Sequence, residues 1–438
     1  MGGGNWTAQN KARAGAYINV KSNNVDRNSG GIRGVVTLPW VGDFGSNDVL
    51  EITSRTDFLR VLGRDIDAPE MLTIRETLKR ATTILLMRVN SEGGTKARAE
   101  TPNGLVITAK HTGSRGNAIR ARIIDNVDNP SVFTVQTLID TTVVDSQSVT
   151  NLSELVANDL VEFVGNGVPE PLAGISLTGG VSAVPDVSDY AHYFETMENY
   201  EFNVMALPIT TSRVRELGVA FIKRQRNDEG KKCQLVLSGS HEDNEAIINV
   251  GNGVILADGT EIEPYIATCW VAGASAGAGV GESNTYTEYD GAVDVTERFS
   301  NSAIVNRLEA GEYIFTLING RIVVEQDINS LITFTQERSR EFSKNTVLRT
   351  LDYVSNGIRS IFARSFIGQV TNNENGRDIL KSAIIEFLEG LQDLGAIENF
   401  GTDDIQIEPG RDKDTVIAQL NIQPTDAIEK LYMTVEMQ

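Results

Sequence analysis

The glycine-rich run Gly273–Gly281 is the part of this sequence that comes nearest to a cofactor site. A dinucleotide-binding loop requires Gly-x-Gly-x-x-Gly between a strand and a helix, because backbone N–H groups must reach a pyrophosphate. Gly277 and Gly279 fit the first two positions, but Glu282 occupies the third. Pro264 also favours a helix before the run, where the motif needs a strand. We therefore expect no cofactor here and predict either a flexible loop or tight helix packing.

The other chemical motifs are incomplete as well. The few histidines and cysteines stand at unrelated positions, which argues against a zinc site: His111, His192, His241, Cys233 and Cys269. The carboxylate-rich segment Asp125–Pro130 has proline where a calcium-binding EF-hand loop needs glycine. The sequence has neither a Gly-x-x-x-x-Gly-Lys-Ser/Thr phosphate loop nor a Gly-x-Ser-x-Gly nucleophile turn. We expect no metal, no cofactor and no catalytic residue, so the protein is not predicted to be an enzyme.

The charge of the chain excludes further classes of partner. The 438 residues include 39 Lys and Arg against 59 Asp and Glu, a net charge of −20. Such a chain repels nucleic acid, whose affinity for proteins comes mainly from phosphate neutralisation, and it repels anionic membrane surfaces. No apolar segment follows Met1 as in a secretory signal. We expect a soluble protein made inside the cell, with no nucleic-acid partner and no membrane binding.

Two stretches of the chain alternate strands and helices, as α/β domains do. In the first, Thr83–Val89 is continuously apolar, as in a buried strand. Pro69 is placed to begin a helix that Asp67 caps. In the second, a predicted helix over Asp186–Asn199 carries an aromatic stripe at helical spacing, which we assign to core packing. The Asn-Gly pair at 319–320, between two β-branched runs, predicts a hairpin.

The rest of the chain has a different sequence pattern. Residues 97–182 contain short strand-like runs separated by Gly, Asn, Asp and Pro, which is typical of a small all-β module. Near the C-terminus, one helix is predicted from an apolar stripe: Leu380, Ile384, Phe387, Leu391 and Leu394. Three strand-like runs follow it: Ile405–Ile407, Val416–Ile422 and Lys430–Glu436. The predicted fold class is a multidomain α/β protein, with an inserted small all-β domain, an α+β C-terminal domain, and extended N- and C-terminal arms.

The predicted domain boundaries lie where the sequence pattern changes. These boundaries assign residues 1–22 to an N-terminal arm, 23–96 plus 183–335 to an α/β core, 97–182 to the inserted domain, and 336–438 to a C-terminal domain whose last part, about 428–438, is a strand arm.

The two predicted arms favour self-association. Strands with unpaired backbone groups are a hazard for a monomer, but a polymer can use them by adding a strand to a neighbour's sheet. The first hundred residues carry 14 − 11 = +3 charges, and residues 376–438 carry 5 − 13 = −8. Opposite signs at the two ends favour attraction between copies.

Four short motifs occur in an order that a known family shares. They are Thr112–Ile119 (Gly-x-x-Gly-Asn), Trp270–Gly273 with the loop after it (Ala-Gly-x-x-Ala), Asp327–Thr333 (Ile-Asn-Thr-Leu-Thr), and Ser339–Asn345 with Arg349 and Asp352 (Lys-Asn-Arg-x-x-Arg-x-x-Asp). Arg115 stands where the family often has Trp, and Thr346 stands where Arg is common. Over essentially the whole chain, the sequence resembles the contractile tail sheath proteins of myophage-type bacteriophages and of related prophage or bacteriocin particles.

The resemblance implies a structural role. Sheath subunits encircle an inner tail tube in stacked six-membered rings, meet baseplate and tail terminator proteins, and contract to drive the tube through a bacterial envelope. They form part of the virion tail, assembled in the host cytoplasm. The terminal arms add strands to neighbouring C-terminal domains; here the arm residues would be Ala16, Tyr17, Ile18, Asn19 and Val20, and Lys430, Leu431, Tyr432, Met433, Thr434 and Val435. The helix around Arg377–Leu394 would face the tube, through Lys381, Glu386, Glu389 and Asp393.

Two alternatives stay open at this point. One is the sheath of a bacteriocin-type or other contractile injection particle, which differs from a phage tail by the absence of a capsid and genome. The other is an α/β nucleotide-binding enzyme with an acidic tail. That reading needs a cofactor fingerprint, and the glycine-rich run does not supply one.

Overall fold

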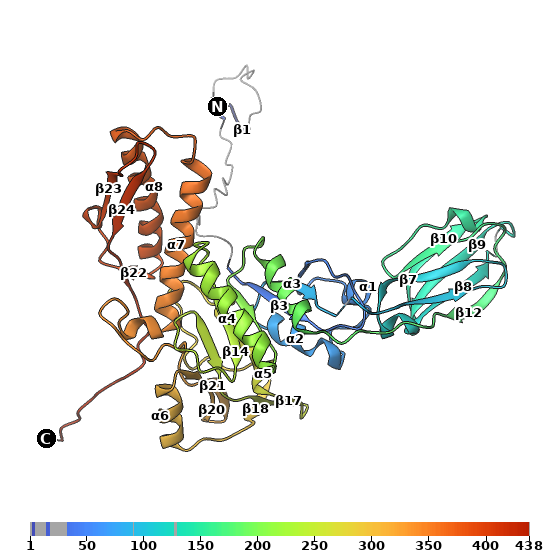
Figure 1. Ribbon diagram of the computed structural model, residues 1–438, viewed down its shortest axis with the longest axis horizontal. Coiled ribbons are helices and arrows are strands. Elements are labelled where there is room, and N and C mark those ends of the chain that lie inside the picture. Colours follow the sequence, from blue (N-terminus) through green and yellow to red (C-terminus); the bar gives the residue numbers. More distant parts are fainter. Residues whose placement is uncertain (1, 5–14, 18–32, 91, 127–128, 438) are drawn as a thin grey trace.

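The computed structural model describes residues 2–4, 15–17, 33–90, 92–126 and 129–437. The molecule is elongated: a β-sandwich projects from one side of a central α/β body, and a unit of two long helices and short strands stands on the other side (Figure 1). The predicted fold class is confirmed: a mixed α/β chain with a small antiparallel sandwich and a helical and β C-terminal region.

A seven-stranded mixed sheet forms the centre of the body. Its strand order is β19-β15-β14-β13-β3-β5-β4, and only β4 runs antiparallel to its neighbour. The strands are β3 Val35–Trp40, β4 Leu50–Ile52, β5 Thr83–Arg88, β13 Val204–Ala206, β14 Gln234–Ser238, β15 Ile247–Val250 and β19 Glu312–Tyr313. The apolar run at 83–89 therefore forms a buried strand next to the edge, as predicted.

Helices cover both faces of this sheet, which explains why its strands are apolar on both sides. Along β14, Leu235 and Leu237 pack in one core with α3 (Val187–Met197) and α4 (Ser212–Asn227), whereas Val236 packs in the other with α5 (Pro264–Gly277). The aromatic stripe of α3 is buried in the first core, as predicted: Tyr190, Tyr193, Phe194 and Met197.

The start of the helix at Pro69 differs from the prediction. Pro69–Met71 forms a 3₁₀ turn whose N-cap is Ala68, and α2 (Leu72–Leu78) follows it. Asp67 does not cap it, because Asp67 is exposed and its N–H is bound to the Asp65 carboxylate in a local turn. A short helix, α1 (Phe58–Leu62), was not predicted; Asp57 caps it.

Smaller elements complete the body. They are β16 Val254–Leu256, β17 Glu261–Ile262 and β18 Ala292–Val295 in one three-stranded sheet, the helix α6 Asn301–Glu309, and the hairpin β20 Phe315–Ile318 with β21 Arg321–Val324. The hairpin prediction is confirmed. Asn319 and Gly320 both have positive φ, 52° and 78°, as a type I′ turn requires.

Between β5 and β13 the chain forms the projecting sandwich. One sheet has the order β10-β9-β8-β12 and the other β11-β7-β6, all antiparallel. The strands are β6 Lys96–Glu100, β7 Val106–Thr112, β8 Ile119–Asp125, β9 Phe133–Ile139, β10 Thr142–Val149, β11 Val161–Val164 and β12 Leu172–Ser176. A polar joint fixes it to the body: buried Arg88 donates to the carbonyl oxygens of Gly42 and Gly45 at 3.1 Å and of Thr112 at 2.7 Å.

The C-terminal unit is built on two helices, α7 (Asn345–Ser365) and α8 (Glu374–Asp393). Two short antiparallel pairs lie beside them: β22 (Ile397–Glu398) with β25 (Gln423–Pro424), and β23 (Ile405–Pro409) with β24 (Val416–Leu420). Four residues of the predicted α8 stripe are buried, but Leu394 is 63% exposed because it lies beyond the last helical residue, at the C-cap.

The glycine-rich run is explained by helix packing. Gly273 and Gly277 lie in α5, where it crosses α2. A Cβ at Gly273 would stand 2.5 Å from the Thr77 carbonyl oxygen, and one at Gly277 would stand 2.3 Å from that of Arg80. These contacts are with backbone atoms, so they cannot be relieved by rotating a side chain. The predicted tight packing is therefore confirmed.

We expect Gly273→Ala to lower the free energy of unfolding by about 2 kcal/mol, because α5 and α2 must separate. The matched control is Gly390→Ala in α8, where no atom lies within 4 Å of the added Cβ. That change is expected to stabilise the protein by about 0.5–1 kcal/mol through helix propensity. Urea unfolding followed by circular dichroism measures both. Equal effects of the two substitutions would contradict this account of the glycines.

Candidate functional site

The described residues offer no chemical centre. They contain no group of three or more His, Cys, Asp or Glu placed to hold a metal ion. Cys233 and Cys269 are fully buried, and burial raises the pKa of each thiol to about 12, so neither is a nucleophile at neutral pH. Within the described ranges, no helix is both long and apolar enough to cross a membrane.

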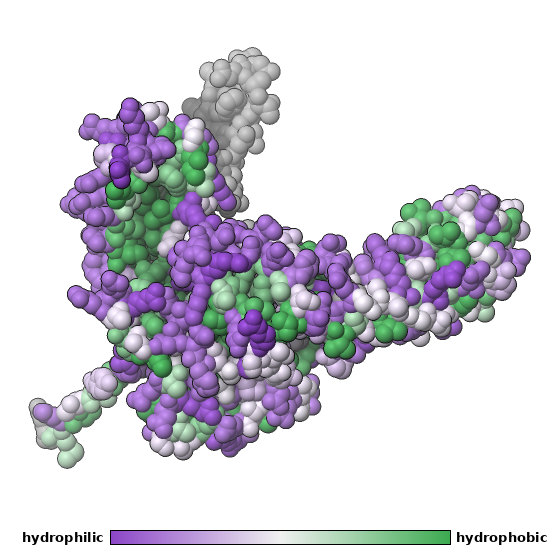
Figure 2. Space-filling model, in the orientation of Figure 1, coloured by the Kyte–Doolittle hydropathy of each residue, from purple (hydrophilic) through white to green (hydrophobic). Residues whose placement is uncertain are grey.

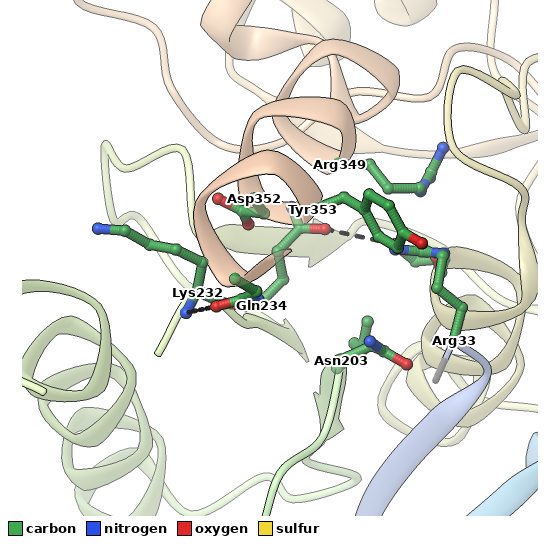
Figure 3. Close-up of a pocket in the computed structure, with 10 residues that line it drawn as sticks. Arg33, Asn203, Lys232, Gln234, Arg349, Asp352 and Tyr353 are labelled. Carbon is green, nitrogen blue, oxygen red and sulfur yellow. Dashed lines mark hydrogen bonds between the residues drawn. The ribbon is translucent and has the colours of Figure 1, made fainter. Parts of the chain in front are cut away.

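A polar cavity lies where the sheet meets α7, but it is too small for a cofactor (Figure 3). Its volume is about 30 Å³, which suits about one water molecule. Arg33 on its wall donates to the carbonyl oxygens of Ser275, Ala276 and Ala278, and so neutralises the C-terminal end of α5. Burial lowers the pKa of Arg33 to about 9, so its charge is retained at neutral pH. This cavity therefore lies in the packing contact between the sheet, the end of α5 and α7.

The feature that stands out is the C-terminal tail. Beyond Glu429, none of the described residues 430–437 makes a hydrogen bond with the rest of the chain, and the tail extends away from the body (Figure 1). Its large apolar side chains are 71–99% exposed: Leu431, Tyr432, Met433, Val435 and Met437. The predicted strand at Lys430–Glu436 is therefore not paired with any part of the chain that the structure describes. A run of exposed apolar residues of this kind is typical of a surface that another molecule covers.

A second unpaired element lies in the same C-terminal unit. The strands β23 and β24 pair only with each other among the described residues, so each leaves one edge open. On β24, Ile417 is 54% exposed. Open edges present backbone N–H and C=O groups that can pair with an added strand. The hairpin is therefore a candidate acceptor.

An apolar groove adjoins the hairpin. It has a volume of about 590 Å³ and runs from the end of α7 to the start of β24, where Phe362, Phe366 and Val416 line it. Figure 2 shows hydrophobic surface gathered in a hollow of this unit between α7 and the hairpin. A strand added to β24 would place alternate side chains toward this hollow.

The residues predicted for the tube-facing helix all lie on α8, but they do not share one face. At about 100° per residue, Glu386, Glu389 and Asp393 fall within about 60° of one another, on the side opposite the buried stripe. These three are exposed and have no ion-pair partner among the described residues. Lys381 is half-buried and lies on the flank of the helix. The structure thus brings together three acidic residues and separates the lysine from them.

The predicted N-terminal strand is described only in part. Ala16 and Tyr17 lie in β2 (Gly15–Tyr17), which pairs in parallel with β1 (Gly2–Gly4). Ile18, Asn19 and Val20 lie outside the described residues.

Sequence reasoning missed the residues that hold the C-terminal tail at its base. The Glu429 side chain forms an ion pair with Lys344 and accepts a hydrogen bond from Thr285 Oγ1 at 2.8 Å. It also missed the roles of the Asn345, Arg349 and Asp352 motif. Asp352 pairs with Arg226 at 2.6 Å, so the motif holds α7 to the body. The spacing of these three residues places them on one face of a helix, which indicates a shared contact, but the residues that they bind are far away in the sequence.

Comparison with known proteins identifies relatives across the chain. Family models match in series: a tail sheath domain III N-terminal region at residues 33–89, a phage tail sheath beta-sandwich domain at 92–183, a phage tail sheath central domain at 183–330, and a phage tail sheath C-terminal domain at 337–438. The chain is 39% identical to the protein XkdK of the phage-like element PBSX of Bacillus subtilis, over all of both chains.

Solved structures agree with these matches. A sheath tail protein from Desulfitobacterium hafniense is 41% identical with a TM-score of 0.82, and the alignment covers 97% of this chain and 100% of that one. A sheath tail protein from Listeria innocua is 36% identical with a TM-score of 0.83, over 94% and 96% of the two chains. The contracted helical sheath of the anti-feeding prophage shares the fold, at 12% identity and a TM-score of 0.57 over 98% and 99%.

Proposed function

The chain belongs to the phage tail sheath protein family, which is structural and non-enzymatic, and on that premise we propose that it polymerises helically around an inner tail tube and contracts. The observation that carries the proposal is the unpaired apolar tail in a molecule that also has an open hairpin beside an apolar groove. Donor and acceptor lie on different surfaces of one chain, so their pairing joins copies head to tail and generates rings or helices.

The tail has the pattern of an added strand. In an extended conformation Leu431, Met433 and Val435 point to one side, and Lys430, Tyr432 and Thr434 point to the other. The first three would enter the apolar groove of a neighbour, and the second three would face outward. At about 3.3 Å per residue, six tail residues span roughly 20 Å, and the five residues of β24 span roughly 17 Å. The lengths therefore match.

The N-terminal segment Ala16–Val20 would also add a strand to a neighbouring subunit, and so would contribute to the same network of paired arms. In this account the four parts of the chain keep the division expected from sequence: arm, α/β core, inserted β-rich domain, and C-terminal domain with its arm. Contraction would move subunits as rigid bodies while the arms stay paired, because backbone pairs along a whole strand are stronger than side contacts that exchange. The partners would be further copies in six-membered rings, the tube, and the baseplate and terminator proteins at the two ends.

The exposed face of α8 that carries Glu386, Glu389 and Asp393 would contact the tube. Glu386, Glu389 and Asp393 have no ion-pair partner among the described residues, so a basic surface opposite them would gain three charge contacts. Reversing all three to Lys is expected to weaken binding to purified tail tubes by at least about tenfold. A matched control reverses Asp125, Glu162 and Glu170 on the sandwich, which are exposed and far from α8. Co-sedimentation with tubes measures both variants, and equal binding would exclude this face.

Negative-stain electron microscopy tests the proposed function. Purified protein is imaged alone and with tail tubes isolated from a related particle. We expect rings or hollow tubes of protein, either alone at high concentration or wrapped around the added tail tubes. Bare tail tubes beside dispersed subunits would contradict the proposal.

A further inference from the structure

The C-terminal arm leaves the subunit at the place where the start of α7 meets the central body. The last contact before that place is Thr425, which donates to the carbonyl oxygens of Ala396 and Gly395. After three exposed residues, Glu429 binds Thr285 of the central body and Lys344, the residue that precedes α7. The Glu429 and Lys344 side chains are only 10% and 19% exposed. The free arm therefore begins at Lys430.

The contact at Glu429 continues into the core as a chain of hydrogen bonds. Thr285 Oγ1 donates to Glu429 and accepts from the backbone N–H of Asp327 at 2.9 Å. The Asp327 carboxylate accepts from Asn345 at 2.9 Å, and Asn345 accepts from Gln234 of β14 at 3.1 Å. Asp327 and Asn345 are 1% and 0% exposed. The root of the arm is thus linked through buried groups to a central strand of the sheet.

The same network holds the C-terminal unit. Arg349, 2% exposed, donates to Asp327 at 3.3 Å, and it lies one turn along α7 from Asn345. The residues Lys344, Asn345 and Arg349 belong to the motif that the sequence singled out. Each of them binds either Glu429 or Asp327, so the motif joins α7, the arm and the sheet at one place.

We propose that Glu429, Lys344 and Thr285 form an arm-root clamp that transmits load on the C-terminal arm into the central sheet; the proposal rests on the arm's proposed role in assembly. Without the clamp, tension on the arm would act on Thr425 and then on β25, which has two residues and, among the described residues, pairs with β22 alone. The clamp also shortens the free segment from residues 426–437 to 430–437, about 40 Å to about 27 Å when extended. Glu429 is a positioning residue: it sets where the arm starts.

The test compares Glu429→Ala with Asp426→Ala. Both remove one carboxylate from the same segment, but Asp426 is exposed and binds only the N–H of its own neighbour. A spin label on Ile428→Cys, which is 97% exposed in the parent, reports the mobility of the segment. The native Cys233 and Cys269 stay unlabelled because both are buried. The second readout is the lifetime of assembled sheaths after dilution, followed by light scattering.

Glu429→Ala is expected to increase label mobility and shorten the sheath lifetime at least about tenfold, because it removes both the ion pair with Lys344 and the hydrogen bond from Thr285. The free subunit should keep its fold, with a lower unfolding midpoint because Lys344 loses its partner. Lys344→Met should behave in the same way, and the double variant should be no worse than either single one. Asp426→Ala should match the parent protein. Equal label mobility in Glu429→Ala and Asp426→Ala, or equal sheath lifetimes, would overturn the clamp.

The two proposals fail in different ways. If the parent protein forms no sheath with or without tail tubes, the proposed function is wrong, and the label on the free subunit still decides whether the clamp exists. If sheaths form and the Glu429 variant behaves like its control, only the clamp is wrong.

Discussion

Removal of residues 430–438 is expected to leave a folded subunit that does not assemble. Residues 430–437 make no hydrogen bond with the described remainder of the subunit, and their large apolar side chains are exposed, so their loss should not unfold it. In the assembly the same residues would supply a strand of backbone pairs at about 1 kcal/mol each, and three buried apolar side chains at about 1.5–3 kcal/mol each. Together these exceed about 5 kcal/mol, so the critical concentration should rise at least about a hundredfold.

Sedimentation of polymer at increasing protein concentration measures this effect, with circular dichroism as the check on folding. The matched control removes only Met437 and Gln438, beyond the proposed strand, and should assemble like the parent protein. Assembly of the long truncation at the parent's concentration would show that the C-terminal arm is not the link between copies.

The second large effect is expected at the acceptor edge. Asn421 donates to Asp404, and Gly410 donates to Thr415, across the β23–β24 pair. Because bonded and non-bonded pairs alternate in an antiparallel ladder, the Ala418–Ile407 pair is non-bonded and the N–H of Ala418 points to the open edge. Ala418→Pro therefore removes a donor for an incoming strand without removing a hairpin bond.

Ala418→Pro is expected to raise the critical concentration for assembly at least about tenfold, because the proline removes one hydrogen bond and its ring obstructs the approach of the strand. Ala418→Ser keeps the N–H at the same exposed position and serves as the control. Light scattering during assembly compares the two. If the proline variant polymerises as the serine variant does, the arm adds to a different edge.

Much of the fold follows from local patterns in the sequence. The buried strand β5, the aromatic stripe of α3 and the hairpin at Asn319-Gly320 each depend on neighbouring residues, and all three are confirmed. The errors at Asp67 and Leu394 concern helix ends, where a local turn or a cap changes the outcome over one or two residues. The helix predicted to begin at Pro264 is α5, and it contains Gly273 and Gly277 of the glycine-rich run.

The contacts that organise the proposed site could not be predicted in the same way. Glu429 lies 85 residues from Lys344 and 144 residues from Thr285, so no periodicity relates them. The open edge of β24 depends on the strand order of the folded chain, which local pattern does not determine. The tail was predicted as a strand from its strand-like run of residues, but its lack of a partner among the described residues is visible only in the structure.

The central claim is that copies of this chain are joined by their C-terminal arms. A cryo-electron microscopy reconstruction of the assembled sheath, at a resolution that shows side chains, tests it most directly. The account predicts that Leu431–Val435 of one subunit pairs with β24 of another, with Leu431, Met433 and Val435 in the groove lined by Phe362 and Phe366. A reconstruction in which the arm is unpaired, or lies on another surface while β24 keeps its open edge, would contradict it.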